Sequence, residues 1–171
     1  MDPVLSLQGI GWVLRKTVGA ATITQHIRTT TTPEGHTNIT FDQILTGGLK
    51  GTTENRTLDW TYRPHSDWLF GDVRGKSRWV TLEKYQEEYA GKGDEAVDED
   101  VKYLVDGWDE ETKGAELVES YVENDDAGWI ARQLWGFAMV DGQRMHVRRV
   151  VVRKGKEVRR IRLVYTWQGE L

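Results

Sequence analysis

An Asp-Gly pair near the C-terminal end constrains the fold of this chain more than any other sequence feature. Asp141-Gly142 stands between two long runs of strand-forming residues, and Asp-Gly is a preferred pair for a two-residue hairpin turn. A turn at this pair fixes which residues lie opposite each other on the two strands. We therefore predict an antiparallel hairpin in which Trp135 lies opposite Arg148 and Phe137 lies opposite His146.

The two faces of this predicted hairpin differ in chemistry. One face is bulky and aromatic, and it consists of Gln133, Trp135, Phe137, Met139, Arg144, His146, Arg148, Val150 and Val152. The other face carries more arginine, and it consists of Arg132, Leu134, Gly136, Ala138, Met145, Val147, Arg149, Val151 and Arg153. Because isolated arginines are costly in an apolar interior, we expect the aromatic face to be inside and the arginine-rich face to meet solvent.

The strand after this hairpin extends the same pattern. If the chain turns through a two-residue loop that includes Gly155, Arg160 and Arg162 join the arginine-rich face. The residues that join the aromatic face are then Ile161, Leu163, Tyr165 and Trp167. A three-residue loop would exchange the two faces, because successive side chains of a strand point to opposite sides.

Most of the chain consists of short segments typical of β-strands, separated by turn signals. We expect strands at 22–30, 36–46, 54–63, 69–80, 102–108, 115–124, 129–140, 143–153 and 158–167. A turn is expected at Gly47-Gly48, and a short helix over 9–21, where apolar residues recur at helical spacing. Consecutive strands joined by short turns form an antiparallel meander, and closure of the meander removes exposed edges. We predict an all-β barrel of about nine to ten strands with a short N-terminal helix.

Length and composition limit the class of protein. The 171 residues are enough for a single domain over the whole chain, and they include no cysteine. Disulfide scaffolds, cysteine nucleophiles and cysteine-based metal sites are therefore excluded, and a cytoplasmic location is expected. No apolar run is long enough to span a membrane, and the first residues lack the features of a signal peptide.

Charge is distributed unevenly along the chain. The segment 81–126 is acidic and the segment 144–162 is basic. A basic segment can bind nucleic acid, but the acidic segment would largely cancel its long-range field, so no nucleic-acid partner is expected. Within the acidic segment, residues 81–101 form an insertion that we expect to begin as a short helix and continue as a solvated loop.

The aromatic face suits a cup for one small ligand, because small barrels have room inside for side chains or for one ligand. The predicted ligand-binding residues are Trp60, Tyr62, Trp79, Gln133, Trp135, Phe137 and Leu163. Buried polar groups need partners, which a ligand or water can supply to Arg148, His146 and Tyr165. In the alternative interpretation, these polar groups satisfy one another within a filled core.

Familiar catalytic motifs are missing from the sequence. It contains no phosphate-binding glycine loop, no nucleophile elbow and no metal-ligand spacing of histidines. No cofactor and no metal are therefore expected, and a hydrolase or redox enzyme is disfavoured.

Several long stretches resemble a known group of proteins. The stretch "GIGWVLRKTVGAATIT" resembles the lid-helix region of fatty-acid-binding proteins. The stretches "LTGGLKGTTENRTLDW", "FGDVRGKSRW" and "WGFAMVDGQRMHVRRVVVRKGKEVRRIRLVY" are similar to small fungal lipocalin-like proteins, a group that includes the pericyclases of the pyrrocidine pathway. The resemblance implies a calycin barrel that binds a lipophilic small molecule. The Arg-x-Tyr carboxylate anchor of fatty-acid-binding proteins does not carry over, because Arg162 and Tyr165 are three residues apart and lie on opposite faces.

The resemblance implies a cofactor-free cyclase or pericyclase of fungal secondary metabolism that closes a ring in a polyene of polyketide type. Such an enzyme needs an apolar cup that folds its substrate and a hydrogen-bond donor for a conjugated carbonyl. Arg148, His146 and Tyr165 are the candidate catalytic residues. The alternative function is a non-catalytic intracellular carrier of a lipophilic small molecule, and the resemblance favours the enzyme.

Overall fold

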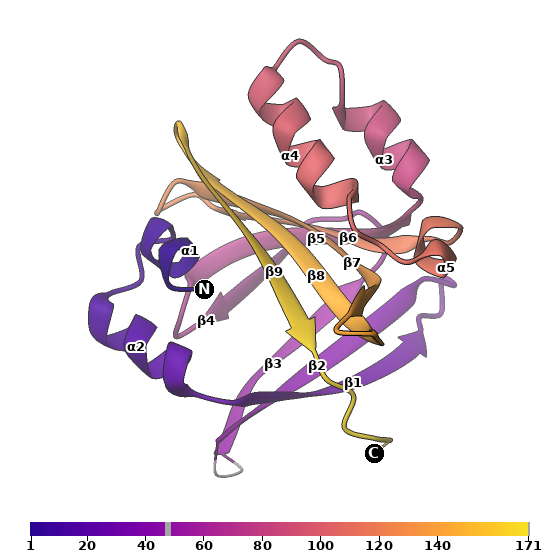
Figure 1. The fold of residues 1–171 in the computed structure, drawn as a ribbon. Coiled ribbons are helices and arrows are strands. Elements are labelled where there is room, and N and C mark those ends of the chain that lie inside the picture. Colours follow the sequence, from indigo (N-terminus) through magenta and orange to yellow (C-terminus); the bar gives the residue numbers. More distant parts are fainter. Residues whose placement is uncertain (47–48, 171) are drawn as a thin grey trace.

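The computed structural model describes residues 1–46 and 49–170, which contain nine β-strands and five helices (Figure 1). The strands of this described part are hydrogen-bonded into two separate antiparallel sheets, one of three strands and one of six. The predicted predominance of antiparallel strands is confirmed, but closure into one barrel is not. The predicted turn at Gly47-Gly48 lies outside the described residues.

The three-stranded sheet has the order β1 (Ile23–Thr31), β2 (Thr37–Leu45) and β3 (Leu49–Thr57). Its central strand carries Phe41, which is fully buried against the larger sheet. The Phe41 ring meets the ring of Trp135 edge to face, with 5.4 Å between the ring centroids. This aromatic contact, together with Ile39, Leu58 and Val118, forms the apolar core between the two sheets.

The six-stranded sheet is a meander in chain order. Its strands are β4 (Arg63–Asp67), β5 (Gly71–Val80), β6 (Leu117–Asn124), β7 (Trp129–Val140), β8 (Gln143–Lys154) and β9 (Glu157–Tyr165). The predicted register of β7 and β8 is confirmed, since Trp135 pairs with Arg148 and Phe137 pairs with His146. Asp141 and Gly142 have φ angles of 50° and 77°, as the type I′ turn requires.

The loop between β8 and β9 has two residues, because Lys154 pairs with Glu157. Of the two alternatives for the last strand, this loop selects the one in which Leu163 lies beside Arg148 and Tyr165 lies beside His146. Trp167 follows the end of β9 and is exposed.

Two short helices precede the first strand. Helix α1 (Asp2–Leu7) begins with a proline in its first turn and buries Val4, Leu5 and Leu7, which places it against β8 and β9. Helix α2 (Trp12–Ala20) lies within the predicted range 9–21, and none of its residues is fully buried. None of the described helices is both long enough and apolar enough to cross a membrane.

In the structure the insertion extends from β5 to β6, over residues 81–116, and it is more helical than the sequence indicated. It contains α3 (Leu82–Tyr89), α4 (Glu95–Val105) and α5 (Glu110–Lys113), which lie over one face of the six-stranded sheet (Figure 1). The prediction of a solvated loop after the first helix is wrong for much of its length, because α4 lies there. The prediction of a strand at 102–108 is wrong for the same reason. The Asp94 side chain accepts hydrogen bonds from the backbone N–H groups of Ala96 and Val97, and such a cap starts a helix.

These helices cover the arginine-rich face over β7 and β8, so the expectation that this face meets solvent is wrong there, whereas Arg160 and Arg162 of β9 are exposed, as expected. Leu134, Val147 and Val151 of that face are buried against Tyr85 and Leu104 of the insertion. Acidic and carbonyl groups of the insertion and the sheet bind the arginine side chains of this face. Arg153 and Arg160 both bind the buried Asp100 carboxylate, Arg149 Nε donates to the Tyr103 carbonyl over 2.7 Å, and Arg78 binds Glu119. These partners offset the cost of burying the guanidinium groups.

The expected strand at 54–63 is correct only in its first part. β3 ends at Thr57 and β4 begins at Arg63, because Trp60 between them has a φ angle of 60° that a strand does not accommodate. The Asp59 side chain accepts a hydrogen bond from the Thr61 N–H over 3.0 Å, which stabilises a local turn.

Candidate functional site

The aromatic face of β7, β8 and β9 points toward the three-stranded sheet, as predicted. Trp135 and Arg148 lie near its centre and are only 5% and 6% exposed. They are positioned by the hairpin register, which sets both side chains on the same side of the sheet. Phe41 of β2 closes over them from the other sheet.

The Arg148 guanidinium is surrounded by aromatic rings. Its central carbon lies 4.0 Å from the ring centroid of Trp135, 4.8 Å from that of Phe41 and 5.0 Å from that of Tyr165. The Nη2 atom donates to Gln25 Oε1 over 3.2 Å. The Nε atom is buried and has no hydrogen-bond partner among the described residues, so its N–H remains as a donor for another acceptor.

Burial lowers the pKa of Arg148 below its ordinary value, and the positive charge of Arg56 acts in the same direction. The negative charge of Glu54 and the nearby Tyr165 oppose this shift. An arginine has so high an ordinary pKa that it remains a cation in proteins. Arg148 therefore places a positive charge within an apolar, aromatic surrounding.

His146 lies between two aromatic rings at the edge of this group. Its ring centroid is 5.7 Å from that of Phe137 and 5.2 Å from that of Tyr165. Burial, and then the positive charge of Arg148, lower the pKa of His146 to about 4. His146 is therefore neutral near pH 7, and it can donate or accept a hydrogen bond there. Phe137 is 40% exposed, so this edge opens to solvent.

The structure brings together seven of the ten predicted site residues on one face of β7 to β9, namely Gln133, Trp135, Phe137, His146, Arg148, Leu163 and Tyr165. Gln133 Oε1 accepts from Trp135 Nε1 over 2.9 Å. Trp79 lies on the same sheet face, because it pairs with Val118 and Val118 pairs with Trp135. It is two strands away from Trp135, however, and is 41% exposed.

Trp60 and Tyr62 are placed elsewhere. Their rings lie 4.2 Å and 4.6 Å from the Lys76 ammonium nitrogen, and Tyr62 Oη donates to Glu123 over 3.0 Å. Lys76 and Glu123 lie on the other face of the six-stranded sheet from Trp135. The structure therefore does not bring Trp60 and Tyr62 to the group around Arg148.

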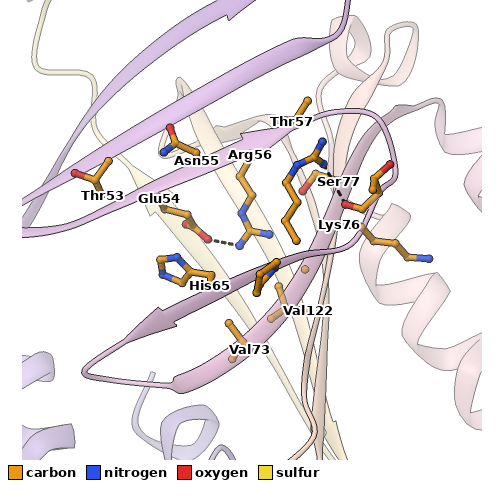
Figure 2. A pocket seen from close by; sticks show the side chains of 14 residues that line it. Thr53, Glu54, Asn55, Arg56, Thr57, His65, Val73, Lys76, Ser77 and Val122 are labelled. Carbon is orange, nitrogen blue, oxygen red and sulfur yellow. Dashed lines mark hydrogen bonds and ion pairs between the residues drawn. The ribbon is translucent and has the colours of Figure 1, made fainter. Parts of the chain in front are cut away.

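A cavity of about 210 Å³ lies between β3 and the β4–β5 hairpin (Figure 2). Most of the residues that line it have polar side chains, and the lining consists of Thr53, Glu54, Asn55, Arg56, Thr57, Thr61, Arg63, Pro64, His65, Val73, Gly75, Lys76, Ser77 and Val122. None of the ten predicted site residues lines this cavity. Successive side chains of a strand point to opposite faces, so Glu54 and Arg56 share the face of Leu58. This alternation is the sequence signal that could have indicated their position.

Arg56 forms one wall of this cavity. Its Nη1 atom donates to Ser120 Oγ over 3.3 Å, and its Nη2 atom forms an ion pair with Glu54, which Figure 2 shows beside His65. A methyl group at Gly75 would lie 2.9 Å from Arg56 Nη1, so glycine at this position leaves space for the guanidinium. Arg56 Nε and Ser77 Oγ are buried without a partner among the described residues.

Two curated relatives match the chain over almost its full length. The pericyclase pydY from an Acremonium species is 34% identical over 170 residues, which are 98% of this chain and 84% of pydY. The chain belongs to this pericyclase family. The probable pericyclase scpY from Mollisia scopiformis is 30% identical over 169 residues, which are 98% of this chain and 82% of scpY.

Membership in the pericyclase family confirms part of the resemblance seen in the sequence. The wider likeness to lipocalins and fatty-acid-binding proteins stays a prediction, since no family model matches the chain. No solved structure matches it either.

Proposed function

We propose that this protein is a pericyclase of secondary metabolism that binds a polyene of polyketide type and promotes closure of a ring within it. The observation that carries this proposal is the near full-length similarity to pydY and scpY. A pericyclic ring closure rearranges bonds within one molecule, so it needs neither a nucleophile nor a redox partner. The proposal therefore assigns the reaction to positioning and hydrogen bonding, without a cofactor.

Arg148 is the proposed catalytic residue. Its unpartnered Nε–H donates a hydrogen bond to a carbonyl oxygen conjugated with the polyene. Electron density moves toward that oxygen in the transition state, and a buried cation stabilises this shift more strongly than water does. Because the guanidinium is already held by Gln25 and by three aromatic rings, little reorganisation accompanies the reaction.

The aromatic side chains near Arg148 have a positioning role in this proposal. Phe137, His146 and Tyr165 lead from the solvent-exposed edge of the sheet to Arg148. Flat rings along this path stack on a conjugated chain and limit its conformations, which lowers the entropic part of the barrier. His146 and Tyr165 are additional donors for the same carbonyl.

Metabolite profiling of the source organism with and without the gene tests the proposal. Loss of the protein should remove a cyclic metabolite and lead to accumulation of an acyclic isomer with the same molecular mass. A profile that is unchanged by deletion would contradict a role in ring closure, provided that the gene is expressed in the parent strain.

A further inference from the structure

The cavity between β3 and the β4–β5 hairpin is chemically distinct from the group around Arg148. Its volume of about 210 Å³ is below the range of roughly 300–1,000 Å³ that holds a complete drug-sized ligand. The cavity is therefore suited to one end of a substrate and not to the whole molecule. Its polar lining indicates that this end carries hydrogen-bonding atoms.

Two buried groups in the cavity wall lack hydrogen-bond partners. They determine which hydrogen-bonding atoms the bound end of a substrate must carry. Arg56 Nε is only a donor, and among the described residues it has no acceptor. Ser77 is 1% exposed, and its hydroxyl also lacks a partner within the described chain. Unpaired buried donors are costly. A ligand with two oxygen acceptors would satisfy both groups.

Arg56 is held in place independently of any ligand. Glu54 and Ser120 fix its two terminal nitrogens, and Gly75 leaves room for it over β5. Nε is the buried Arg56 nitrogen that has no partner among the described residues, and these two contacts fix its direction before a ligand arrives. A prepared donor of this kind reduces the entropic cost of binding.

The cavity and Arg148 lie on the same side of the six-stranded sheet. Ser77 of β5 and Arg148 of β8 lie on the same face of the six-stranded sheet. They are three strands apart and two residues out of register, which corresponds to roughly 14 Å across the strands and about 7 Å along them. An extended polyketide chain can reach both positions. Glu54 connects them, since it lines the cavity and its charge acts on Arg148.

We propose that this cavity binds the oxygen-bearing head group of the substrate, a carboxylate or an enolised β-dicarbonyl, through Arg56 Nε and Ser77 Oγ. The assignment of this head group to the substrate rests on the proposed function. The polyene then extends from the cavity toward Arg148, and the head group determines which substrates are accepted. Ser77 and Arg56 are specificity residues in this scheme, and Arg148 acts on the reacting part.

Binding of unreactive probes tests the head-group site separately from catalysis. The probes are decanoic acid, a decanoyl-substituted cyclic β-diketone, and decanol as a chain that lacks the second oxygen, each titrated calorimetrically. Ser77→Ala should weaken binding of the two head-bearing probes about tenfold and leave decanol unchanged. Arg56→Lys keeps a positive charge beside Glu54 but removes Nε, and it should have the same selective effect. Ser66→Ala, on β4 but outside the cavity lining, is the matched control.

Stability measurements separate a binding role for Ser77 from a structural one. Because the Ser77 hydroxyl has no partner within the described chain, Ser77→Ala should not lower the melting temperature. The head-group site is wrong if Ser77→Ala binds both head-bearing probes as tightly as the wild type, if decanol loses as much affinity, or if the wild type binds neither head-bearing probe. Selective loss of probe binding supports the site even if the wild type closes no ring. Such a result would overturn only the proposed function.

Discussion

The guanidinium carbon of Arg148 lies 4.0 Å from the centre of the Trp135 ring, directly across the β7–β8 hairpin. Cation–π contacts of this kind contribute roughly 0.5–2 kcal/mol. Removal of a guanidinium from water costs more than one such contact returns. The rings and the hydrogen bond to Gln25 therefore compensate only part of the cost of burying Arg148, which is consistent with the catalytic role proposed for it.

Substitution of Arg148 by methionine should separate stability from activity. Arg148→Met fills a similar volume and removes the incompletely compensated charge, so the free energy of unfolding should stay the same or rise by about 1–4 kcal/mol. Turnover should fall about a hundredfold, because the carbonyl loses its donor. Urea denaturation and the initial rate of product formation measure the two effects.

Arg149→Met is the matched control for this experiment. Arg149 is the next residue, but it lies on the opposite face and donates to the Tyr103 carbonyl of the insertion. Its substitution should lower stability by about 1 kcal/mol and leave turnover within about twofold. Equal losses of turnover in the two variants would refute the catalytic assignment of Arg148.

His146 should make the fold sensitive to acid. Its pKa is lowered from 6.5 to about 4 in the folded protein, so the unfolded chain binds a proton more tightly. The stability that depends on neutral His146 is complete above pH 6.5 and is lost as the pH falls toward 4, with a slope of up to ~1.4 kcal/mol per pH unit. Unfolding free energies measured across this range should decline less steeply for His146→Phe. Parallel curves for the two proteins would show that His146 does not titrate in this way.

Asp100 should be essential for docking of the insertion onto the sheet. Its buried carboxylate binds Arg153 of β8 and Arg160 of β9. Asp100→Ala leaves both guanidinium groups without their partner and should lower the free energy of unfolding by about 3 kcal/mol. By contrast, Glu110→Ala removes the exposed pair with Lys113 and should cost less than ~0.5 kcal/mol. Similar denaturation midpoints for the two variants would argue against an anchoring role for Asp100.

Gly136 should not tolerate a larger residue. A methyl group at this position would lie 2.7 Å from Thr112 Cγ2 and 3.0 Å from Leu117 Cδ2. Gly136→Ala should therefore destabilise the fold by roughly 1–3 kcal/mol through overpacking. Gly19→Ala in helix α2 meets no atom within 4 Å and should stabilise the helix by about 0.5–1 kcal/mol. Thermal denaturation of both variants checks these opposite signs.

The register of the C-terminal strands could be predicted from the sequence because local turn chemistry determines it. Asp141-Gly142 fixes the pairing of β7 with β8, and the faces of Trp135 and Arg148 follow from that pairing. The environment of each face could not be predicted in the same way. The helices over the arginine-rich face lie far from the hairpin in sequence, and Asp100 meets Arg153 only in the tertiary fold.

Two local features explain the errors elsewhere in the chain. The apolar residues of 102–108 fit a strand, but Val101, Leu104 and Trp108 also recur at helical spacing and pack on one core. The positive φ angle of Trp60 has no sequence signal of the kind that glycine gives. The polar cavity depends on the approach of β3 to the β4–β5 hairpin, a contact between two sheets that no local pattern specifies.

Ring closure by this protein is tested most directly by incubating the purified protein with the acyclic polyene that accumulates when its gene is deleted. We expect the wild type to form a cyclic product of identical mass faster than it forms in buffer, and Arg148→Met to form it about a hundredfold more slowly than the wild type. Recovery of the polyene unchanged, although the wild-type protein binds it, would contradict catalysis and would identify the protein as a carrier.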